Sequence, residues 1–272
     1  MPFIQARDGT NLFYQDWGSG PPLLFVPPWS LNSAWWEYQI AYLADQGLRC
    51  VSFDRRGHGR SGWPGHGYDF DTLADDLAAV IQQLDLHGIT LVGHSMGAAE
   101  VVHYLSRHGA DRVARAVLVS TISPFTLKTA DNPEGTDRSS LEKGRTDLSK
   151  DRPYQIAKAA RGFFGADKNS ISPGIMDWWT RMMLDQCSLK VMLDLHRVFT
   201  ETDFRPALRA ITVPTLLIHG DSDTSTPLEL TGRKAARLIP GCRLKVYENA
   251  AHALPITHMD RLNADLLAFV KG

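Results

Sequence analysis

Cysteine is scarce in this chain of 272 residues. Its three cysteines, Cys50, Cys187 and Cys242, are odd in number and far apart along the sequence. This excludes the disulfide framework that holds small secreted domains together, and also the close cysteine spacing of a structural metal site. Cys50 opens an apolar run and fits a small buried hydrophobic residue.

An excess of one charge and long apolar runs are also missing. The 29 Lys and Arg residues nearly balance the 30 Asp and Glu residues, so the sequence offers no basic surface for nucleic acid. No stretch approaches the roughly eighteen apolar residues of a membrane-spanning helix, and the first residues lack the basic and apolar segments of a secretory signal. We therefore expect a cytoplasmic protein that binds neither nucleic acid nor membrane.

Apolar runs alternate with helical patterns over most of the chain. After a hairpin signal at Asp8-Gly9, this alternation predicts an α/β fold, a mostly parallel and doubly wound sheet with helices on both faces. The expected strands are Phe3–Ala6, Asn11–Trp17, Leu23–Val26, Val51–Phe53, Ile89–Val92, Ala116–Val119, Leu216–Ile218 and Arg243–Glu248. The expected helices are Trp36–Asp45, Leu73–Leu86, Ala98–His108, Leu228–Ile239 and Thr257–Val270.

Residues 124–206 break the alternation. They contain no convincing strand; residues 126–152 are polar and charged and are expected to be loosely ordered, and helical patterns follow them. We therefore expect a core domain of residues 1–123 and 207–272, with residues 124–206 inserted between two strands as a helical cap. The helical patterns of the cap cover Tyr154–Phe164, Ile175–Cys187 and Leu189–Phe199.

Large apolar side chains are concentrated in this expected cap. They fit two interpretations, which both stay open: they pack the cap onto the core, or they line an apolar substrate pocket. The candidates for the pocket are Phe163, Phe164, Trp178, Trp179 and Met183.

A serine stands between two glycines directly after an apolar strand. Ile89–Val92 leads into Gly93-His94-Ser95-Met96-Gly97, and a helical pattern follows. This is the pattern of a nucleophile elbow, in which a strained turn exposes the serine and the glycines allow neighbouring backbone to pass closely. Ser95 is therefore the predicted nucleophile.

A serine hydroxyl needs a base to activate it, and the base needs an acid to orient it. Open parallel sheets place such groups on loops at the carboxyl ends of later strands. Asp223, further out on the loop after Leu216–Ile218, is favoured as the acid over Asp221, which suits backbone hydrogen bonds in the turn. His252 follows the last strand through small residues and is favoured as the base over the nine other histidines.

The oxyanion formed during acyl transfer needs two preorganised hydrogen-bond donors. One is expected from the backbone N–H of Met96, directly after the nucleophile. The other should come from the loop after Leu23–Val26, which reads Pro27-Pro28-Trp29-Ser30. Because proline has no N–H, Trp29 is the first residue of this loop that can donate.

Together these residues resemble the α/β-hydrolase superfamily over essentially the whole chain. The motifs are Gly93–Gly97, the run Asp54–Gly62 that is similar to the family's D-x-R-G-x-G-x-S turn, Gly220–Asp223, and Ala251-His252. The chain is most similar in appearance to small capped esterases and to cofactor-free haloperoxidase or perhydrolase-like members. This resemblance implies hydrolysis of a small carboxylic ester or lactone without a metal or cofactor.

By the same resemblance, Asp223 and His252 take the acid and base positions and Trp29 takes the oxyanion position. The family usually carries His-Gly before that residue, where this chain has Pro27-Pro28. Proline cannot take a positive φ, so we expect this loop to follow a different path. Perhydrolase-like members often have proline after the oxyanion residue, and here Ser30 counts against peracid chemistry.

Three alternatives to ester hydrolysis stay open. The same triad serves peracid formation in perhydrolases or haloperoxidases, and it serves cleavage of a carbon–carbon bond next to a carbonyl. A third possibility is a ligand-binding protein that keeps the triad for slow, single-turnover use. The sequence leaves the oligomeric state open.

Overall fold

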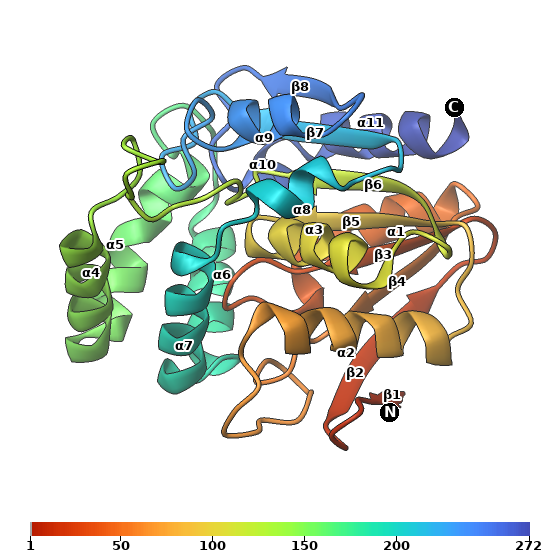
Figure 1. Cartoon of the computed structure of the whole chain (residues 1–272), viewed down its shortest axis with the longest axis horizontal. Coiled ribbons are helices and arrows are strands. Elements are labelled where there is room, and N and C mark those ends of the chain that lie inside the picture. Colours follow the sequence, from red (N-terminus) through yellow and green to blue (C-terminus); the bar gives the residue numbers. More distant parts are fainter. Residues whose placement is uncertain (1) are drawn as a thin grey trace.

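An eight-stranded sheet runs through the computed structural model, which describes residues 2–272 (Figure 1). The strand order is β1-β2-β4-β3-β5-β6-β7-β8; β2 pairs antiparallel with β1 and β4, and the remaining neighbours are parallel. The predicted fold class is thus confirmed. The strands are β1 (Phe3–Gln5), β2 (Asn11–Trp17), β3 (Pro22–Val26), β4 (Arg49–Phe53), β5 (Ile89–His94), β6 (Val113–Val119), β7 (Thr215–Gly220) and β8 (Arg243–Tyr247).

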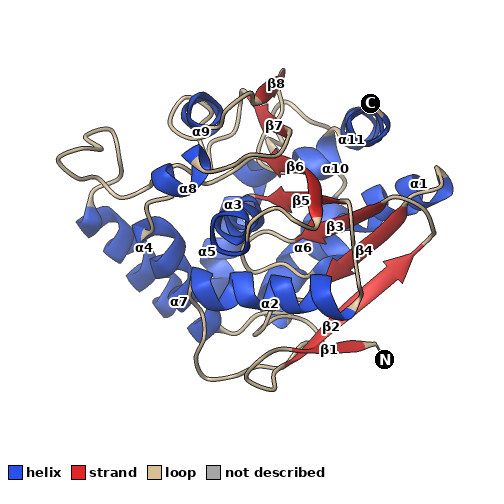
Figure 2. Cartoon of the chain, turned by 45° about the vertical axis from the view of Figure 1, so that its right-hand side comes forward, coloured by secondary structure: helices blue, strands red, loops and turns tan. Residues whose placement is uncertain are grey.

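Helices cover both faces of the sheet, as Figure 2 shows. On α2, the residues Leu73, Leu77 and Ile81 are buried at intervals of four, which is the apolar stripe that a helix turns toward a sheet. Every residue of β5 is buried, because this central strand is covered on both faces. One face carries α1 (Glu37–Asp45) and α11 (Met259–Lys271); the other carries α2 (Phe70–Gln83), α3 (Met96–His108) and α9 (Gly232–Leu238).

Five helices lie between β6 and β7 in the chain. Four of them, α4 to α7, form a group at the left of the sheet in Figure 1. The expected boundary between residues 206 and 207 falls inside the fifth, α8. The helices are α4 (Arg138–Lys150), α5 (Arg152–Phe164), α6 (Pro173–Asp185), α7 (Leu189–Glu201) and α8 (Arg205–Arg209).

Helix α4 corrects the expectation that residues 126–152 are loosely ordered. Its sequence is polar, but Leu141, Arg145 and Leu148 are buried at intervals of four and three residues. This narrow stripe is enough to hold a helix against its neighbours when the remaining face is solvated.

No helix among residues 2–272 is both long and apolar enough to cross a membrane.

Candidate active site

Ser95 occupies the turn between β5 and α3. Its φ of 57° is rare for a residue other than glycine and marks a strained backbone. The turn is held because the Ser95 N–H donates to the carbonyl of Val119 on the neighbouring strand β6, at 2.9 Å. This places the hydroxyl at the carboxyl edge of the sheet, at the N-terminus of a helix.

The two glycines of the elbow allow three backbone segments to meet. A Cβ on Gly93 would lie 2.4 Å from the carbonyl oxygen of Gly97. A Cβ on Gly97 would lie 2.4 Å from the oxygen of Val26 and 2.6 Å from that of Pro27. The glycine at 97 therefore lets the loop after β3 approach the first turn of α3.

We expect Gly97→Ala to destabilise the fold by about 1–3 kcal/mol, because the new methyl group collides with backbone rather than with a movable side chain. Hydrolytic activity should fall as well, since the loop after β3 has to shift. Urea unfolding and steady-state kinetics measure the two effects. Gly144→Ala on α4 is the matched control: a Cβ there meets nothing within 4 Å, and wild-type stability of Gly97→Ala would contradict the close-packing argument.

His252 and Asp223 lie in direct contact. Nδ1 of His252 is 2.7 Å from Oδ2 of Asp223, and the hydroxyl of Thr226 donates to the same oxygen at 2.9 Å. The second oxygen, Oδ1, accepts the backbone N–H groups of Ser225 and Thr226 at 2.9 and 2.8 Å. The carboxylate is therefore fixed on both sides, and it holds the imidazole in one orientation.

The environment keeps this carboxylate ionised. Burial would by itself raise the pKa of Asp223, but the attraction of His252 and the hydrogen bonds from His219 and His252 lower it well below the ordinary value. By contrast, Asp221 is exposed and accepts the backbone N–H of Asn249 at 2.8 Å. The structure thus brings Asp223 to His252 and uses Asp221 in the turn.

His94 anchors the loop that carries His252. The indole N–H of Trp35 donates to Nδ1 of His94 at 3.0 Å. Because Nδ1 accepts, the ring hydrogen is on Nε2, which donates to the backbone carbonyl of His252 at 3.0 Å. Burial and the neighbouring His252 lower the pKa of His94 well below its ordinary value, so it stays neutral. Sequence reasoning missed this contact and the one from Thr226.

The two backbone N–H groups predicted as oxyanion donors, those of Met96 and Trp29, come from different segments of the chain. Met96 is the first residue of α3, where an N–H has no partner within the helix. Among the backbone hydrogen bonds of residues 2–272, none uses the N–H of Trp29. The indole of Trp29 donates instead to the carbonyl of Met192 on α7, at 3.0 Å. Ser30, the next residue, has a φ of 60°, which proline cannot adopt.

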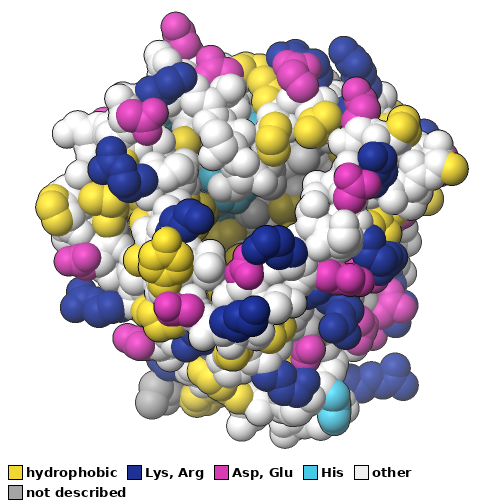
Figure 3. All heavy atoms as spheres, turned by 90° about the vertical axis from the view of Figure 1, so that its left-hand side faces the viewer, with side chains coloured by type: hydrophobic (Ala, Val, Ile, Leu, Met, Phe, Trp, Pro, Cys, Tyr) yellow, Lys and Arg dark blue, Asp and Glu magenta, His cyan; other side chains and the backbone are white. Residues whose placement is uncertain are grey.

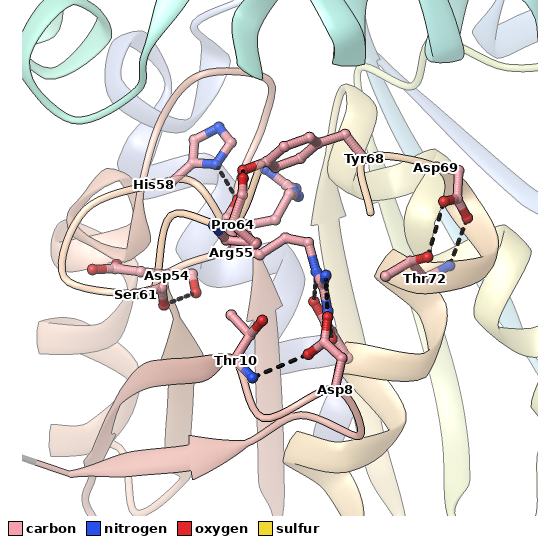
Figure 4. A network of polar contacts seen from close by, with 12 residues as sticks. Asp8, Thr10, Asp54, Arg55, His58, Ser61, Pro64, Tyr68, Asp69 and Thr72 are labelled. Atoms are coloured by element: carbon pink, nitrogen blue, oxygen red, sulfur yellow. Dashed lines mark hydrogen bonds and ion pairs between the residues drawn. The ribbon is translucent and has the colours of Figure 1, made fainter. Parts of the chain in front are cut away.

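The turn that follows β4 is held from several directions (Figure 4). The carboxylate of Asp54 accepts the backbone N–H groups of Ser33 and Arg60, each at 2.9 Å. The hydroxyl of Ser61 donates to the carbonyl of Asp54. This bracing of the D-x-R-G motif directs the side chain of Arg55 into the interior of the protein.

Arg55 fixes the loop after β3. Its guanidinium donates to the carbonyls of Pro27 and Pro28 at 2.6 and 3.3 Å, and to Glu100 at 2.8 Å. Both charged side chains are fully buried. Burial raises the pKa of Glu100 to about 6, although the attraction of Arg55 opposes the rise. The two prolines thus offer carbonyls to a buried cation, which stabilises the path of the loop ahead of Trp29.

We expect Arg55→Met to cost about 3–5 kcal/mol, because it leaves Glu100 as an uncompensated buried charge. Urea unfolding measures the loss. Arg49→Met is the matched control, since the Arg49–Asp16 pair is about one-third exposed and such a pair contributes only about 0–1 kcal/mol. Equal costs for the two variants would contradict the role assigned to the buried pair.

A cavity of about 420 Å³ opens in front of Ser95. Figure 3 looks onto this side of the molecule, where histidine and apolar side chains lie inside a hollow and charged side chains surround it. Glu134 and Lys234, which form an ion pair at 2.5 Å, belong to its wall. Most of the wall is apolar or aromatic, and it includes Trp29, Ile122, Phe125, Leu148, Ile156, Phe163, Trp179, Met183, His196, Phe199 and His252.

Two of the five expected pocket residues lie outside this wall. Phe163, Trp179 and Met183 line the cavity. Phe164 is fully buried against the ring of Phe163, with the centroids 5.3 Å apart. Trp178 faces the other way, because it stacks on Trp35 at 6.2 Å. Neighbouring positions on a helix point about 100° apart, which separates the two tryptophans of α6.

The described part of the chain was also searched for side chains that could bind a metal ion. Within residues 2–272, no group of three or more His, Cys, Asp or Glu side chains is arranged to hold a metal ion.

The sheet, the serine at its strained turn and the cavity in front of it define a hydrolase of the α/β type. A family model described as alpha/beta hydrolase fold matches residues 21–259, and the chain belongs to this family. The predicted superfamily is thereby confirmed.

Relatives within the family carry more than one activity in their names. The chain is 42% identical over 276 residues to a non-heme haloperoxidase of Rhodococcus erythropolis, with 100% of both chains covered. It is 36% identical over 278 residues to a bifunctional esterase/perhydrolase of Acinetobacter calcoaceticus, again with 100% of both covered. The structure superposes on a bromoperoxidase from Bacillus anthracis with a TM-score of 0.95 and 34% identity, covering 100% of this chain and 99% of the other.

Proposed function

We propose that the protein hydrolyses small carboxylic esters or lactones through an acyl-enzyme on Ser95. The observation that carries the proposal is that Ser95, held at a strained turn, and His252, held by Asp223 at 2.7 Å, line one and the same cavity. A nucleophile, a base and an orienting acid are the groups that acyl transfer needs.

The steps follow from these positions. His252 takes the hydroxyl proton of Ser95 as its oxygen attacks the substrate carbonyl, and the N–H groups of Trp29 and Met96 stabilise the oxyanion. The intermediate collapses, the alcohol leaves with the proton from His252, and an ester to Ser95 remains. Water then attacks this ester with His252 as the base, which releases the acid and restores the hydroxyl. Asp223 stabilises the imidazolium in both halves.

We also propose that residues 124–206 act as a cap that shapes the substrate site. Support comes from the cavity wall, to which α4, α5, α6 and α7 all contribute side chains, whereas Ser95 and His252 follow strands of the sheet. An apolar wall suits the hydrocarbon part of an ester or lactone.

Peracid formation is the second candidate, and the names of the relatives favour it. In that reaction peroxide replaces water as the acceptor of the acyl group. Ser30 supports hydrolysis instead. Its φ of 60° is closed to the proline that perhydrolase-like members often carry after the oxyanion residue.

We expect the purified protein to hydrolyse p-nitrophenyl acetate faster than it supports peroxide-dependent bromination at the same enzyme and acyl-donor concentrations. The physical reason is that the loop after Trp29 takes a path that proline cannot follow. Initial rates of the two reactions give the comparison, with Ser95→Ala as the blank for both. Bromination that outpaces hydrolysis would establish the peracid reaction as the principal one.

A further inference from the structure

His196, on α7, is a polar side chain in the wall of the cavity that contains Ser95. Its ring lies between two aromatic neighbours, with centroid distances of 5.6 Å to Trp29 and 5.1 Å to Phe199. Trp29 also supplies the proposed oxyanion donor from its backbone, so the imidazole contacts the side chain of a residue of the proposed site. His196 has no role in the proposed steps of hydrolysis.

The hydrogen-bonding capacity of the ring is unused. Nδ1 of His196 is buried and has no hydrogen-bond partner, and Nε2 forms no hydrogen bond to any side chain or backbone group of residues 2–272. Burial, together with the charge of Arg145, lowers the pKa of His196 to about 4. The ring is therefore neutral near pH 7, with one N–H donor and one acceptor nitrogen.

The position of the ring hydrogen follows from the cost of burial. A buried N–H without an acceptor is rarer in proteins than an acceptor without a donor. The favoured tautomer of His196 thus leaves the buried Nδ1 without a hydrogen and puts the N–H on Nε2. His196 then offers one N–H donor to the cavity, in a wall that is mostly apolar.

We propose that the Nε2–H of His196 donates a hydrogen bond to a second oxygen of the substrate, distinct from the oxygens of the scissile ester. The favoured substrates are then esters or lactones that carry an ether, keto or hydroxyl oxygen on the side of the scissile carbonyl that faces Trp29. This inference rests on the proposed function of Ser95 and names the substrate class of that site. In the free protein this N–H can bond only to water. A substrate oxygen can replace that water, whereas a methylene group at the same place would leave the N–H without a partner in a mostly apolar wall, so the preference has a physical basis.

Matched ligands test this proposal because an ether oxygen replaces a methylene group with little change in shape. Ethyl 3-methoxypropanoate against ethyl pentanoate places the oxygen in the acyl part, and 2-methoxyethyl acetate against butyl acetate places it in the alcohol part. Isothermal titration calorimetry with Ser95→Ala gives the four affinities without turnover. The same measurements follow in Ser95→Ala carrying His196→Leu, and in Ser95→Ala carrying Phe199→Leu as the control for an altered wall.

In one of the two pairs we expect the ether to bind about 2- to 10-fold more tightly than the hydrocarbon, the range of one neutral hydrogen bond. His196→Leu should abolish this preference, and Phe199→Leu should keep it. The ligand pair whose preference is lost in His196→Leu shows whether the second oxygen belongs to the acyl or the alcohol part of the substrate. Equal affinities in both pairs, or a preference that survives His196→Leu, overturn the proposal.

Hydrolysis of the same four esters by the wild-type protein and by Ser95→Ala tests the proposed function separately. If hydrolysis does not depend on Ser95, the proposed function fails, while the affinity ratios still decide the role of His196. If hydrolysis depends on Ser95 and the ratios do not depend on His196, the subsite alone is wrong.

Discussion

Ser95→Ala is expected to lower kcat for ester hydrolysis by about four to six orders of magnitude, the range seen when the nucleophile of a serine triad is removed. The loss is large because no other group at the carboxyl end of β5 can form the acyl-enzyme. KM should change little, since the methyl group leaves the wall of the cavity intact. Steady-state kinetics on p-nitrophenyl esters measure both constants.

The control for this variant is Ser225→Ala. Ser225 lines the same cavity, but its place in the site comes from its backbone N–H, which the change preserves. We expect this variant to keep nearly all of the activity, and circular dichroism should show both proteins folded. Near-normal turnover by folded Ser95→Ala would rule out the acyl-enzyme mechanism.

Asp223→Asn is expected to lower kcat by about 10⁴-fold. The carboxylate accepts the hydrogen on Nδ1 of His252, so Nε2 is left free to take a proton from Ser95. An amide at position 223 can donate to Nδ1 instead, which favours the wrong tautomer and no longer stabilises the imidazolium. Steady-state kinetics measure the loss. Asp221→Asn is the matched control, with a small expected effect because its side chain serves the turn.

The depressed pKa of Asp223 also has a consequence for stability. An unfolded aspartate titrates near 3.8, and the folded carboxylate titrates below that value. The ionised group therefore stabilises the fold at pH values above 3.8, and this stabilisation is lost as the pH falls toward the folded pKa. In Asp223→Asn that contribution should be missing, so the variant should lose less stability than the wild type on acidification.

Much of the fold follows from periodicity. Strands covered on both faces leave continuous apolar runs, and this is why β3, β5 and β7 could be predicted closely. The hairpin at Asp8-Gly9 was also predicted correctly, since Gly9 takes the positive φ that the turn requires. Helix α4 was missed because two leucines and the stem of an arginine supply its whole buried stripe, and such a stripe is inconspicuous in a polar sequence.

In the site, too, some residues could be predicted from the sequence and others could not. Ser95 is marked by its local pattern, and Asp223 and His252 are marked by their places on the loops after later strands of the sheet. The partners of these residues could not be predicted. Trp35 meets His94 across 59 positions of the chain, and Thr226 reaches both members of the acid–base pair only once the loop has folded.

Because helices α4 to α7 are separate from the sheet, substrate preference could change without changes to the sheet. The reacting groups stand on loops of the sheet, whereas most of the side chains that a substrate's hydrocarbon portion would touch come from one continuous stretch of chain. On the proposed mechanism, variation confined to that stretch should change which molecules bind and should spare the groups that carry out the reaction. A combinatorial library restricted to these helices should therefore yield a high proportion of active enzymes with altered preferences.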